Sequence, residues 1–550
     1  MAPTMPRRLR AGLLLLCALL IVASAEGSRA QRLNVRVSDP SQVQPDPEEV
    51  SIALDPTDHG HLAVGANITY LYTSSDSGMT WAMKEMSSRY GFWGDPVLLY
   101  DDSGMLYYEH LSGQNWQDPE FLFRIVIQRS ADHGITFDSG EQTGYAPPTM
   151  QDKAWLSLDR SPTASRGSIL TSWNEDDKYG STAPGDSDRI FFSRTTDRGA
   201  TWSERTRVDD RGGDCLDSSN TLEGATTAVT KNGEICIAWC GRDTIYFDRS
   251  LDGGRTFGHD RAIELQPGGW NFKVPGIFRA NGFPMLSSDM NPSSPFYGRL
   301  YIMWSDQRRG VTDVYTMHSD DAGLSWSKRQ RVNTDSSLQH HFFPSMTVDP
   351  VTGHLFIVYY DRRAYQDART DVYLATSVDG GVSFHDERIS ESAFTPADSI
   401  FFGDYIGISA HDRHVHPVWM RLDVDPQNGR PHTSVWTTSI QDTFGLAHAS
   451  VASGTTTQVK DDAVRVDGVG LSAGINVSIA HGGSVMLDLR DVLGRRLRTL
   501  LAGEYGAGEY RIGLPAGLAP GTYLVRLEVS PTGAASAAFS THVAKFVVTP

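Results

Sequence analysis

Ser-Leu-Asp-Gly-Gly-Arg-Thr-Phe, at residues 250–257, is one of six copies of an eight-residue pattern: Ser/Thr-x-Asp-x-Gly-x-Ser/Thr-aromatic. The other copies begin at Ser74, Ser130, Thr195, Ser319 and Ser377. Successive copies start 56, 65, 55, 69 and 58 residues apart. The chain is therefore an array of similar units, and each unit contains one such pattern.

The pattern has the chemistry of a tight turn. A Ser or Thr hydroxyl and an Asp carboxylate can hydrogen-bond to backbone groups, Gly can adopt a positive φ, and the aromatic ring can pack between units. Units of this length with β-type patterning predict an all-β protein built as a β-propeller, with about four strands in each blade. The six turns resemble the Asp-box, or BNR, repeat of sialidases and related propellers. This resemblance implies the fold more strongly than an activity.

We expect seven blades, with six as the alternative. The predicted inner strands are Val50–Leu54, Pro96–Tyr100, Ala154–Leu158, Ala225–Val229, Pro284–Ser288, Phe343–Val348 and Tyr405–Ala410. The last unit has no boxed turn and no obvious fourth strand, whereas the stretch Arg32–Ser38 alternates like the fourth strands of other units. A propeller must cover its last sheet edge, so we expect this N-terminal strand to complete the last blade.

The first 30 residues have the layout of a secretory signal. Arg7, Arg8 and Arg10 precede an apolar run, Ala11–Ala23, and small residues follow it. We therefore expect a secreted or cell-surface protein with a signal peptide at 1–30, a propeller at 31–442, a linker at 443–463 and a second β domain at 464–550. The formal net charge of −17 argues against nucleic acid as a partner. We expect a monomer.

Three cysteines follow the leader: Cys215, Cys236 and Cys240. Cys236 and Cys240 are about 13 Å apart along an extended strand, too far for a disulfide. We expect Cys215 to pair with Cys240, and three free buried thiols are the alternative. No ligand spacing supports a zinc site.

Residues 464–550 alternate apolar and polar side chains in the manner of a small β-sandwich, for example over 485–495 and 518–527. Together with the closing Lys545-Phe546-Val547-Val548, this pattern resembles the C-terminal sorting domain of the type IX secretion route and the related FlgD-type immunoglobulin-like domain. The resemblance implies a bacterial protein that meets the secretion machinery through this domain. A plain sugar-binding module is the alternative.

The face opposite the boxed turns is the expected functional face, because strand ends from every blade converge there around the axis. Carboxylates dominate this face in the early blades and arginines in the later ones, which would suit a substrate with negative charge at one end. Calcium could bind an acidic cluster such as Asn174–Asp177, although a solvated loop is the alternative. No other metal or cofactor is predicted.

The resemblance to sialidases implies three arginines that grip a carboxylate, a tyrosine nucleophile beside a glutamate, and an aspartate that donates a proton. The residues that could fill these roles are Arg279, Arg308, Arg362 and Asp404 for substrate binding, Tyr405 and Glu223 for attack, and Asp95 or Asp152 for the proton. The Phe/Tyr-Arg-Ile-Pro motif of sialidases does not precede the first boxed turn. Asp and Arg residues that follow an aromatic, as in Trp304-Ser305-Asp306 and Tyr360-Asp361-Arg362, could instead form ion pairs between blades.

Two functions remain open on the sequence. The first is a secreted, sialidase-like glycoside hydrolase that acts on terminal, acidic glycans. The second is a propeller scaffold that binds a glycan or a glycoprotein on the axial face without chemistry. A fold by itself does not decide between them.

Overall fold

The computed structural model describes residues 33–39, 46–115, 117–424 and 429–444 of the first part of the chain. In the second part it describes residues 463–467, 474–480, 483–491, 495–505, 508–513, 521–531 and 540–548. The expected signal peptide lies outside these residues, as does most of the expected linker. The chain divides into two compact units, Met1–Asp442 and Thr443–Pro550. Within the described ranges every regular element is a strand, and no helix is long and apolar enough to cross a membrane.

Antiparallel sheets make up the first unit. Sheet 1 contains β2 (Ser51–Leu54), β3 (Leu62–Ala66), β4 (Tyr70–Ser74) and β5 (Ala82–Glu85). Sheet 2 contains β6 (Val97–Tyr100), β7 (Leu106–Leu111), β8 (Ile125–Ser130) and β9 (Glu141–Thr143). Sheet 3 contains β10 (Met150–Leu158), β11 (Ile169–Asp176), β12 (Asp188–Thr195) and β13 (Thr206–Arg207). Sheet 4 is β14 (Glu223–Val229), β15 (Ile235–Gly241), β16 (Thr244–Ser250), β17 (Arg261–Leu265). A short hairpin, β18 (Asn271–Phe272) and β19 (Ala280–Asn281), follows it.

The remaining sheets complete the unit. Sheet 5 contains β20 (Met285–Ser288), β21 (Leu300–Asp306), β22 (Asp313–Ser319) and β23 (Gln330–Arg331). Sheet 6 contains β24 (His341–Val348), β25 (Leu355–Asp361), β26 (Asp371–Ser377) and β27 (His385–Arg388). Sheet 7 is β28 (Gly407–His411), β29 (His414–Val424), β30 (Pro431–Thr437) and β1 (Val35–Arg36), with β31 (Ile440–Gln441) added to β29.

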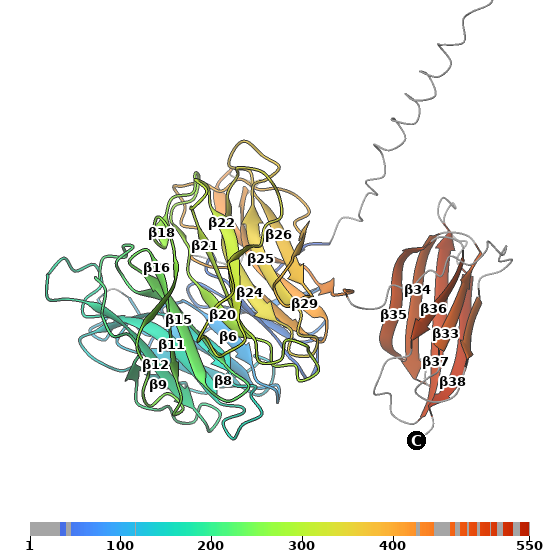
Figure 1. The fold of residues 1–550 in the computed structure, drawn as a ribbon, viewed down its shortest axis with the longest axis horizontal. Coiled ribbons are helices and arrows are strands. Elements are labelled where there is room, and N and C mark those ends of the chain that lie inside the picture. The colour runs from blue at the N-terminus through green and yellow to red at the C-terminus, as the bar shows by residue number, and fades with distance from the viewer. Residues whose placement is uncertain are drawn as a thin grey trace, which may run out of the picture. The chain divides into compact units, whose positions relative to one another are not determined.

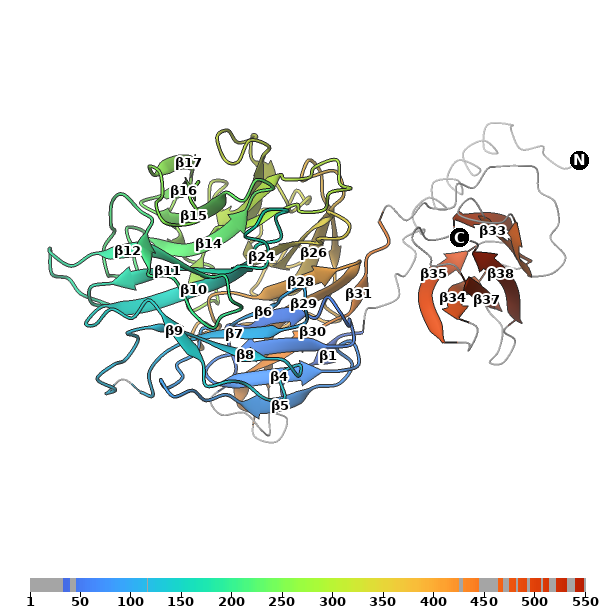
Figure 2. The ribbon, with the colours of Figure 1, turned by 90° about the horizontal axis from the view of Figure 1, so that it is seen from below.

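The sheets form a closed ring (Figures 1 and 2). The innermost strand of each sheet contacts the innermost strand of the next, and β28 of sheet 7 contacts β2 of sheet 1. The first strand of the chain completes sheet 7, because Val35 pairs with Thr437 and Arg36 with Trp436. The predicted all-β propeller is confirmed, and its N-terminal strand lies where the sequence predicted it.

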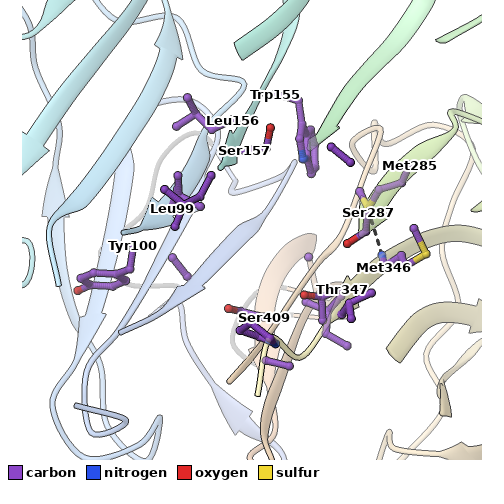
Figure 3. Close-up of a pocket in the computed structure, with 18 of the residues that line it drawn as sticks. Leu99, Tyr100, Trp155, Leu156, Ser157, Met285, Ser287, Met346, Thr347 and Ser409 are labelled. Atoms are coloured by element: carbon purple, nitrogen blue, oxygen red, sulfur yellow. Dashed lines mark hydrogen bonds between the residues drawn. The ribbon is translucent and has the colours of Figure 1, made fainter. Parts of the chain in front are cut away.

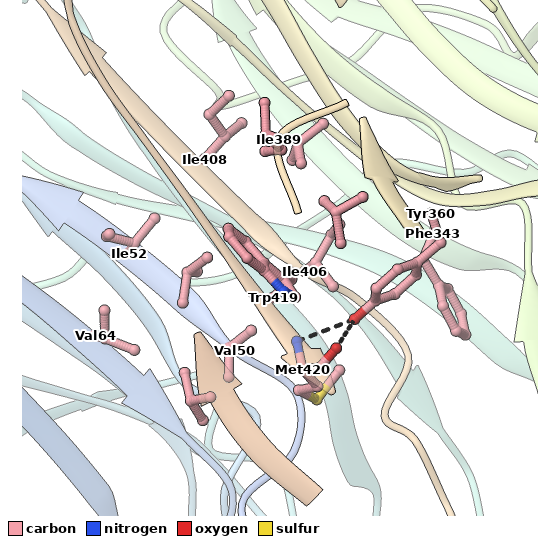
Figure 4. Close-up of a cluster of buried hydrophobic side chains, with 14 of the residues drawn as sticks. Val50, Ile52, Val64, Phe343, Tyr360, Ile389, Ile406, Ile408, Trp419 and Met420 are labelled. Atoms are coloured by element: carbon pink, nitrogen blue, oxygen red, sulfur yellow. Dashed lines mark hydrogen bonds between the residues drawn. The ribbon is translucent and has the colours of Figure 1, made fainter. Parts of the chain in front are cut away.

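Buried aromatic and aliphatic side chains fill the seam where the ring closes (Figure 4). Trp419 of β29 packs among them with 1% of its surface exposed. The Tyr360 hydroxyl of β25 donates to the Met420 carbonyl over 2.7 Å and accepts from the Met420 N–H over 3.0 Å. This pair of hydrogen bonds ties sheet 6 to sheet 7 and leaves the buried hydroxyl satisfied.

Each boxed turn has the same hydrogen bonds. In the turn after β12, Thr195 Oγ1 donates to Asp197 and accepts from the Gly199 N–H, and Asp197 also accepts from the backbone and side chain of Thr201. The glycine has positive φ, +80° at Gly199. At Gly254 a Cβ atom would collide with the Phe192 ring of the preceding sheet, so close packing between sheets also requires glycine here.

The boxed turns and the starts of the inner strands lie at opposite ends of each sheet. In sheet 4, the register places Ser250 of the box opposite Ile235, which in turn pairs with Val229 at the end of the inner strand. Glu223, at the start of that strand, pairs with Cys240. The end of the ring formed by these inner-strand starts is called the axial mouth below.

The three cysteines that follow the leader are buried and free, so the predicted pairing of Cys215 with Cys240 is wrong and the alternative of free buried thiols holds. Cys240 Sγ instead donates to the Glu223 carbonyl over 3.2 Å.

The second unit contains two antiparallel sheets. The first is β32 (Ala463–Asp467), β33 (Gly474–Ile479) and β36 (Gly508–Gly513), and the second is β35 (Arg496–Tyr505), β34 (Gly483–Asp491), β37 (Gly521–Pro531) and β38 (Ser540–Val548). Alternate residues of β33, β34 and β37 form one buried core, for example Val477, Leu487 and Leu527. Side chains from both sheets share this core, which is the arrangement of a β-sandwich.

We predict that Asp197→Ala lowers the free energy of unfolding of the propeller by about 1–3 kcal/mol, because the turn loses hydrogen bonds to one carboxylate. Urea denaturation followed by tryptophan fluorescence measures this change. Glu204→Ala, an exposed change just after the same turn, should leave the midpoint unchanged. Equal effects of the two variants would contradict a structural role for the turn.

Candidate functional site

A recurring bend in the backbone builds the axial mouth. The residue that enters the inner strand has positive φ in most sheets: Glu49, Asp95, Lys153, Gly224, Phe343 and Gly403. At three of these points the strand register shifts, as a β-bulge requires. A bulge redirects a side chain from the position that a regular strand would give it. Four of the six positions are not glycine, and they adopt a positive φ, which non-glycine residues rarely do.

Lys153 lies at the centre of the mouth. Its ammonium group is 3.0 Å from Asp95, 3.0 Å from Asp404 and 3.4 Å from Glu49. The three carboxyl groups come from sheets 2, 7 and 1, whereas Lys153 belongs to sheet 3. Burial, followed by the charge of Asp95, raises the pKa of Glu49 well above its usual range. Only 12% of the Lys153 side chain is exposed. A single buried cation therefore joins four segments that are distant in the sequence.

Arg279, at the start of β19, extends this network. Its guanidinium contacts both oxygens of Asp404 and lies 2.6 Å from Asp217, which also accepts a hydrogen bond from the Tyr179 hydroxyl. Asn281 Nδ2 donates to the Asp404 backbone carbonyl over 2.8 Å. Burial alone would raise the pKa of Asp404, but Lys153 and Arg279 hold it well below its usual range. Asp404 is thus an ionised carboxylate that two cations share.

Other carboxyl groups at the mouth are kept protonated. Burial raises the pKa of Asp152 to about 8, and the charge of Asp95 adds to the shift, although Lys153 opposes it. Burial also raises the pKa of Glu48 to about 8 and that of Glu223 well above its usual range. Neighbouring acids in opposite protonation states are a common property of sites for acid–base chemistry.

Asn174 of β11 connects two of the predicted residues. With its amide nitrogen turned toward them, Asn174 donates to the Asp152 carbonyl over 2.9 Å and to Glu223 over 3.1 Å. Asp152 and Glu223 both stand at register shifts, in neighbouring inner strands. The structure therefore brings Asp95, Asp152, Glu223, Arg279 and Asp404 into one connected region, as the sequence suggested.

Tyr405 is close to this region, but its surroundings do not suit a nucleophile. Its hydroxyl is buried and has no hydrogen-bond partner among the described residues, and burial raises its pKa well above the usual range. Its ring lies edge-on to Trp155 at 5.5 Å. The expected glutamate partner, Glu223, contacts Asn174 instead. The role predicted for Tyr405 with Glu223 is therefore corrected to packing.

The three arginines do not form a clamp, since they share no partner in the described part of the chain. Arg308 bonds to Asp306 over 2.8 Å, to the Leu265 carbonyl over 2.8 Å and to Glu264 at 3.5 Å. Arg362 has other partners, which are described below. The prediction failed for a local reason: Asp306 and Arg308 stand two residues apart in one turn and pair with each other.

Lys153 and Arg279, the two cations of this network, are already paired with carboxyl groups, so neither is free to bind an acidic sugar. The predicted preference for negative charge is therefore not supported at the axis. Sequence reasoning also missed Lys153, Glu49 and Asp217 as members of the network. Lys153 could have been noticed as the lysine among acidic inner-strand starts, but the loop that places Asp217 left no signal in the sequence.

A cavity of about 220 Å³ lies along the axis, and the inner strands of all the sheets in the ring line it (Figure 3). Serines, methionines and aliphatic side chains form most of its wall, including Ser157, Ser287 and Met346. Trp155 is part of this wall, two residues after Lys153. The apolar edge contact between Trp155 and Tyr405 thus lies next to both the cavity and the charged network.

No group of His, Cys, Asp and Glu side chains within the described ranges is arranged to hold a metal ion. In the stretch proposed for calcium, Asp177 pairs with Arg189 at 2.8 Å. Burial raises the pKa of Asp176 to about 7. These contacts give no support to calcium binding at Asn174–Asp177.

No model of a known protein family and no curated protein sequence matches the chain. Similar solved structures include a protein of unknown function from Dyadobacter fermentans, with 13% identity over 75% of this chain and 99% of that one and a TM-score of 0.42. The NanB sialidase of Streptococcus pneumoniae has 9% identity over 69% and 83% of the two chains, with a TM-score of 0.41. The Trypanosoma rangeli sialidase in complex with the inhibitor DANA has 11% identity over 94% and 93%, with a TM-score of 0.39.

We predict that Lys153→Met destabilises the propeller by about 3–5 kcal/mol, because it leaves buried carboxylates without their cation. The loss should be larger at pH 8 than at pH 5. Lys153 holds the pKa of Asp404 down, so without it this carboxylate can take up a proton as the pH falls, which removes part of the repulsion. Urea denaturation at both pH values measures the change, with the exposed Lys328→Met as control. A loss that does not depend on pH would contradict this account.

Proposed function

We propose that the protein is a glycoside hydrolase of sialidase-like fold whose chemistry uses paired carboxyl groups at the axial mouth. The observation that carries this proposal is the pair formed by Asp95 and Asp152 around Lys153. Asp95 is ion-paired to Lys153 at 3.0 Å, whereas Asp152 has a pKa raised to about 8. Glycoside hydrolysis needs one protonated and one ionised carboxyl group.

In this mechanism Asp152 donates its proton to the leaving glycosidic oxygen as the bond to the anomeric carbon breaks. The Asp95 carboxylate faces the positive charge that develops on the sugar, and serves either as nucleophile or as base for the attacking water. Lys153 holds the Asp95 carboxylate in position through their ion pair, and Asp404 and Arg279 hold Lys153 in the network. Tyr405 and Trp155 pack against each other next to the network and take no part in bond making.

The substrate at the mouth is a neutral sugar residue. Arg279 is committed to Asp404 and Asp217, so a sugar carboxylate at this point would meet acids without a free cation to balance them. Neutral hydroxyl groups can instead donate to the carboxylates that line the mouth. This substrate class differs from the acidic sugar that the sequence suggested.

A non-catalytic scaffold is the second candidate function. The observation that favours it is the pairing of Arg279 and Arg308 with neighbouring carboxylates, which also occurs where charges only join blades. In that case the mouth binds a glycan or glycoprotein without turnover.

For its location and partners, we propose that the protein is exported and reaches the cell surface or the medium, with the sandwich of the second unit as its contact with the secretion machinery. The sandwich core described above supports a separate folding unit of this kind. The partner on the propeller is then an extracellular glycan, and the propeller acts as a monomer.

We predict that the full-length chain hydrolyses a neutral aryl hexoside or hexosaminide from a panel that also contains an aryl sialoside and an aryl uronide. Asp152→Asn should lower kcat/KM by about 100-fold or more, because the proton donor is lost. Asp177→Asn, a change at a neighbouring acid paired to Arg189, is the matched control and should retain activity.

The rate should also depend on pH in a defined direction. Asp152 must be protonated to act as the acid, so kcat/KM should fall as the pH rises through about 8. Asp152→Asn should abolish this alkaline limb. If no member of the panel is turned over, the hydrolase proposal is wrong and the scaffold is the better description.

A further inference from the structure

A groove of about 460 Å³ lies beside the axial mouth, between the β18–β19 hairpin and the loops of sheets 5 and 6. Lys273, Phe278, Gln307, His340 and Asp398 are among the residues that line it. Its volume lies within the range of ligand pockets. Phe278 and Arg279 are adjacent in the chain, so the groove begins where the charged network of the mouth ends.

Phe278 gives the groove an exposed aromatic surface. Its side chain is 52% exposed, more than that of any other phenylalanine in the described residues. The ring is held in place, because it lies edge-on to Phe401 at 5.9 Å, and the Arg279 guanidinium lies over Phe401 at 5.2 Å. An ordered aromatic ring that remains open to solvent can pack against the apolar face of a sugar.

Arg362 places a buried positive charge, without a direct ion pair among the described residues, behind the wall of the groove. It is 2% exposed, and its guanidinium donates to the Pro275 carbonyl over 2.6 Å and to Thr370 over 3.0 Å. Its backbone N–H donates to the His340 carbonyl. Within the described ranges Nη2 has no hydrogen-bond partner, the guanidinium lies over the Phe342 ring at 5.0 Å, and the charge of Asp367 acts on it from a distance. Buried charges are normally paired, so this arginine can stabilise an anion nearby.

The groove and the mouth therefore differ in charge. Lys273 is exposed on the groove, Arg362 lies behind it, and Asp398 is the acid among its lining residues. Carboxyl groups dominate the charged network of the mouth, and its cations Lys153 and Arg279 are paired. A ligand that spans the two would place a neutral part at the axis and an acidic part in the groove.

We propose that the groove is an accessory subsite for an acid-bearing sugar, such as a uronic or sialic acid residue, of the glycan whose neutral residue occupies the mouth. Phe278 packs against this sugar ring, and Lys273 pairs with its carboxylate in the field of Arg362. The inference rests on the proposed function for the neutral residue, but binding in the groove can be tested without turnover. It assigns the preference for an acidic glycan to this subsite rather than to the axis.

Calorimetric titration of the full-length Asp152→Asn protein tests the subsite, because this variant binds without hydrolysis. The acidic probes are 3′-sialyllactose and 6′-sialyllactose, and lactose is their neutral counterpart. We expect at least one acidic probe to bind more than fivefold tighter than its neutral counterpart. Its affinity should fall as salt rises from about 0.05 M to about 0.5 M, because the pair with Lys273 is exposed.

Matched variants identify the residues that act. Lys273→Met should remove the preference for the acidic probe and leave the binding of lactose unchanged, whereas Phe278→Ala should weaken both kinds by threefold or more. Lys328→Met, on another exposed groove of the propeller, is the charge-matched control and should bind like the parent. Circular dichroism melts confirm that each variant is folded.

The subsite is overturned if acidic and neutral probes bind equally, if none binds, or if Lys273→Met and Lys328→Met behave alike. If only the hydrolase proposal is wrong, the result differs: no aryl glycoside is turned over, but the acidic probe still binds and its binding still depends on Lys273. The two proposals can therefore fail separately.

Discussion

The structure depends on the pairing of β1 with β30, which closes the ring. A short strand from the start of the chain completes the last sheet and covers an edge that would otherwise be exposed. Buried side chains fill both sides of sheet 7: Trp419 packs among them, and Tyr360 of sheet 6 is bonded to both backbone groups of Met420. Each sheet has its own hydrogen bonds, but the position of sheet 7 beside sheet 1 depends on this contact.

The axial mouth is a product of the same closure. Glu49 comes from sheet 1 and Asp404 from the chain that leads into sheet 7, and Lys153 holds both. These groups approach one another only when the ring is complete. The electrostatic properties of the mouth follow from their burial: one acid is forced to stay ionised between two cations, while neighbouring acids stay protonated. The same charged groups therefore contribute to the stability of the ring and to the proposed chemistry, so a substitution at one of these residues affects both.

The architecture was predictable because it repeats. The residues of the six boxed turns predict the hydrogen bonds that these turns form, and their regular spacing predicts one four-stranded sheet for each unit. The region of the site was also predictable, because inner-strand starts must converge on an axis, and Asp95, Asp152, Glu223, Arg279 and Asp404 do so. Individual roles were not. The partner of an arginine depends on loops that no repeat specifies, so Arg308 and Arg362 were misplaced, and burial turned Tyr405 into a packing residue.

The positive-φ bend at the start of the inner strands has a consequence for how such a protein can change. The same backbone geometry presents a carboxylate in sheets 1 and 2, an amine in sheet 3 and an aromatic ring in sheet 6, with glycine in others. The bend thus provides an equivalent backbone position in each of these sheets, and this position can carry different side chains while the sheet itself stays the same. Single substitutions at these positions could therefore change the ligand preference of the mouth without changing the strands that form the ring.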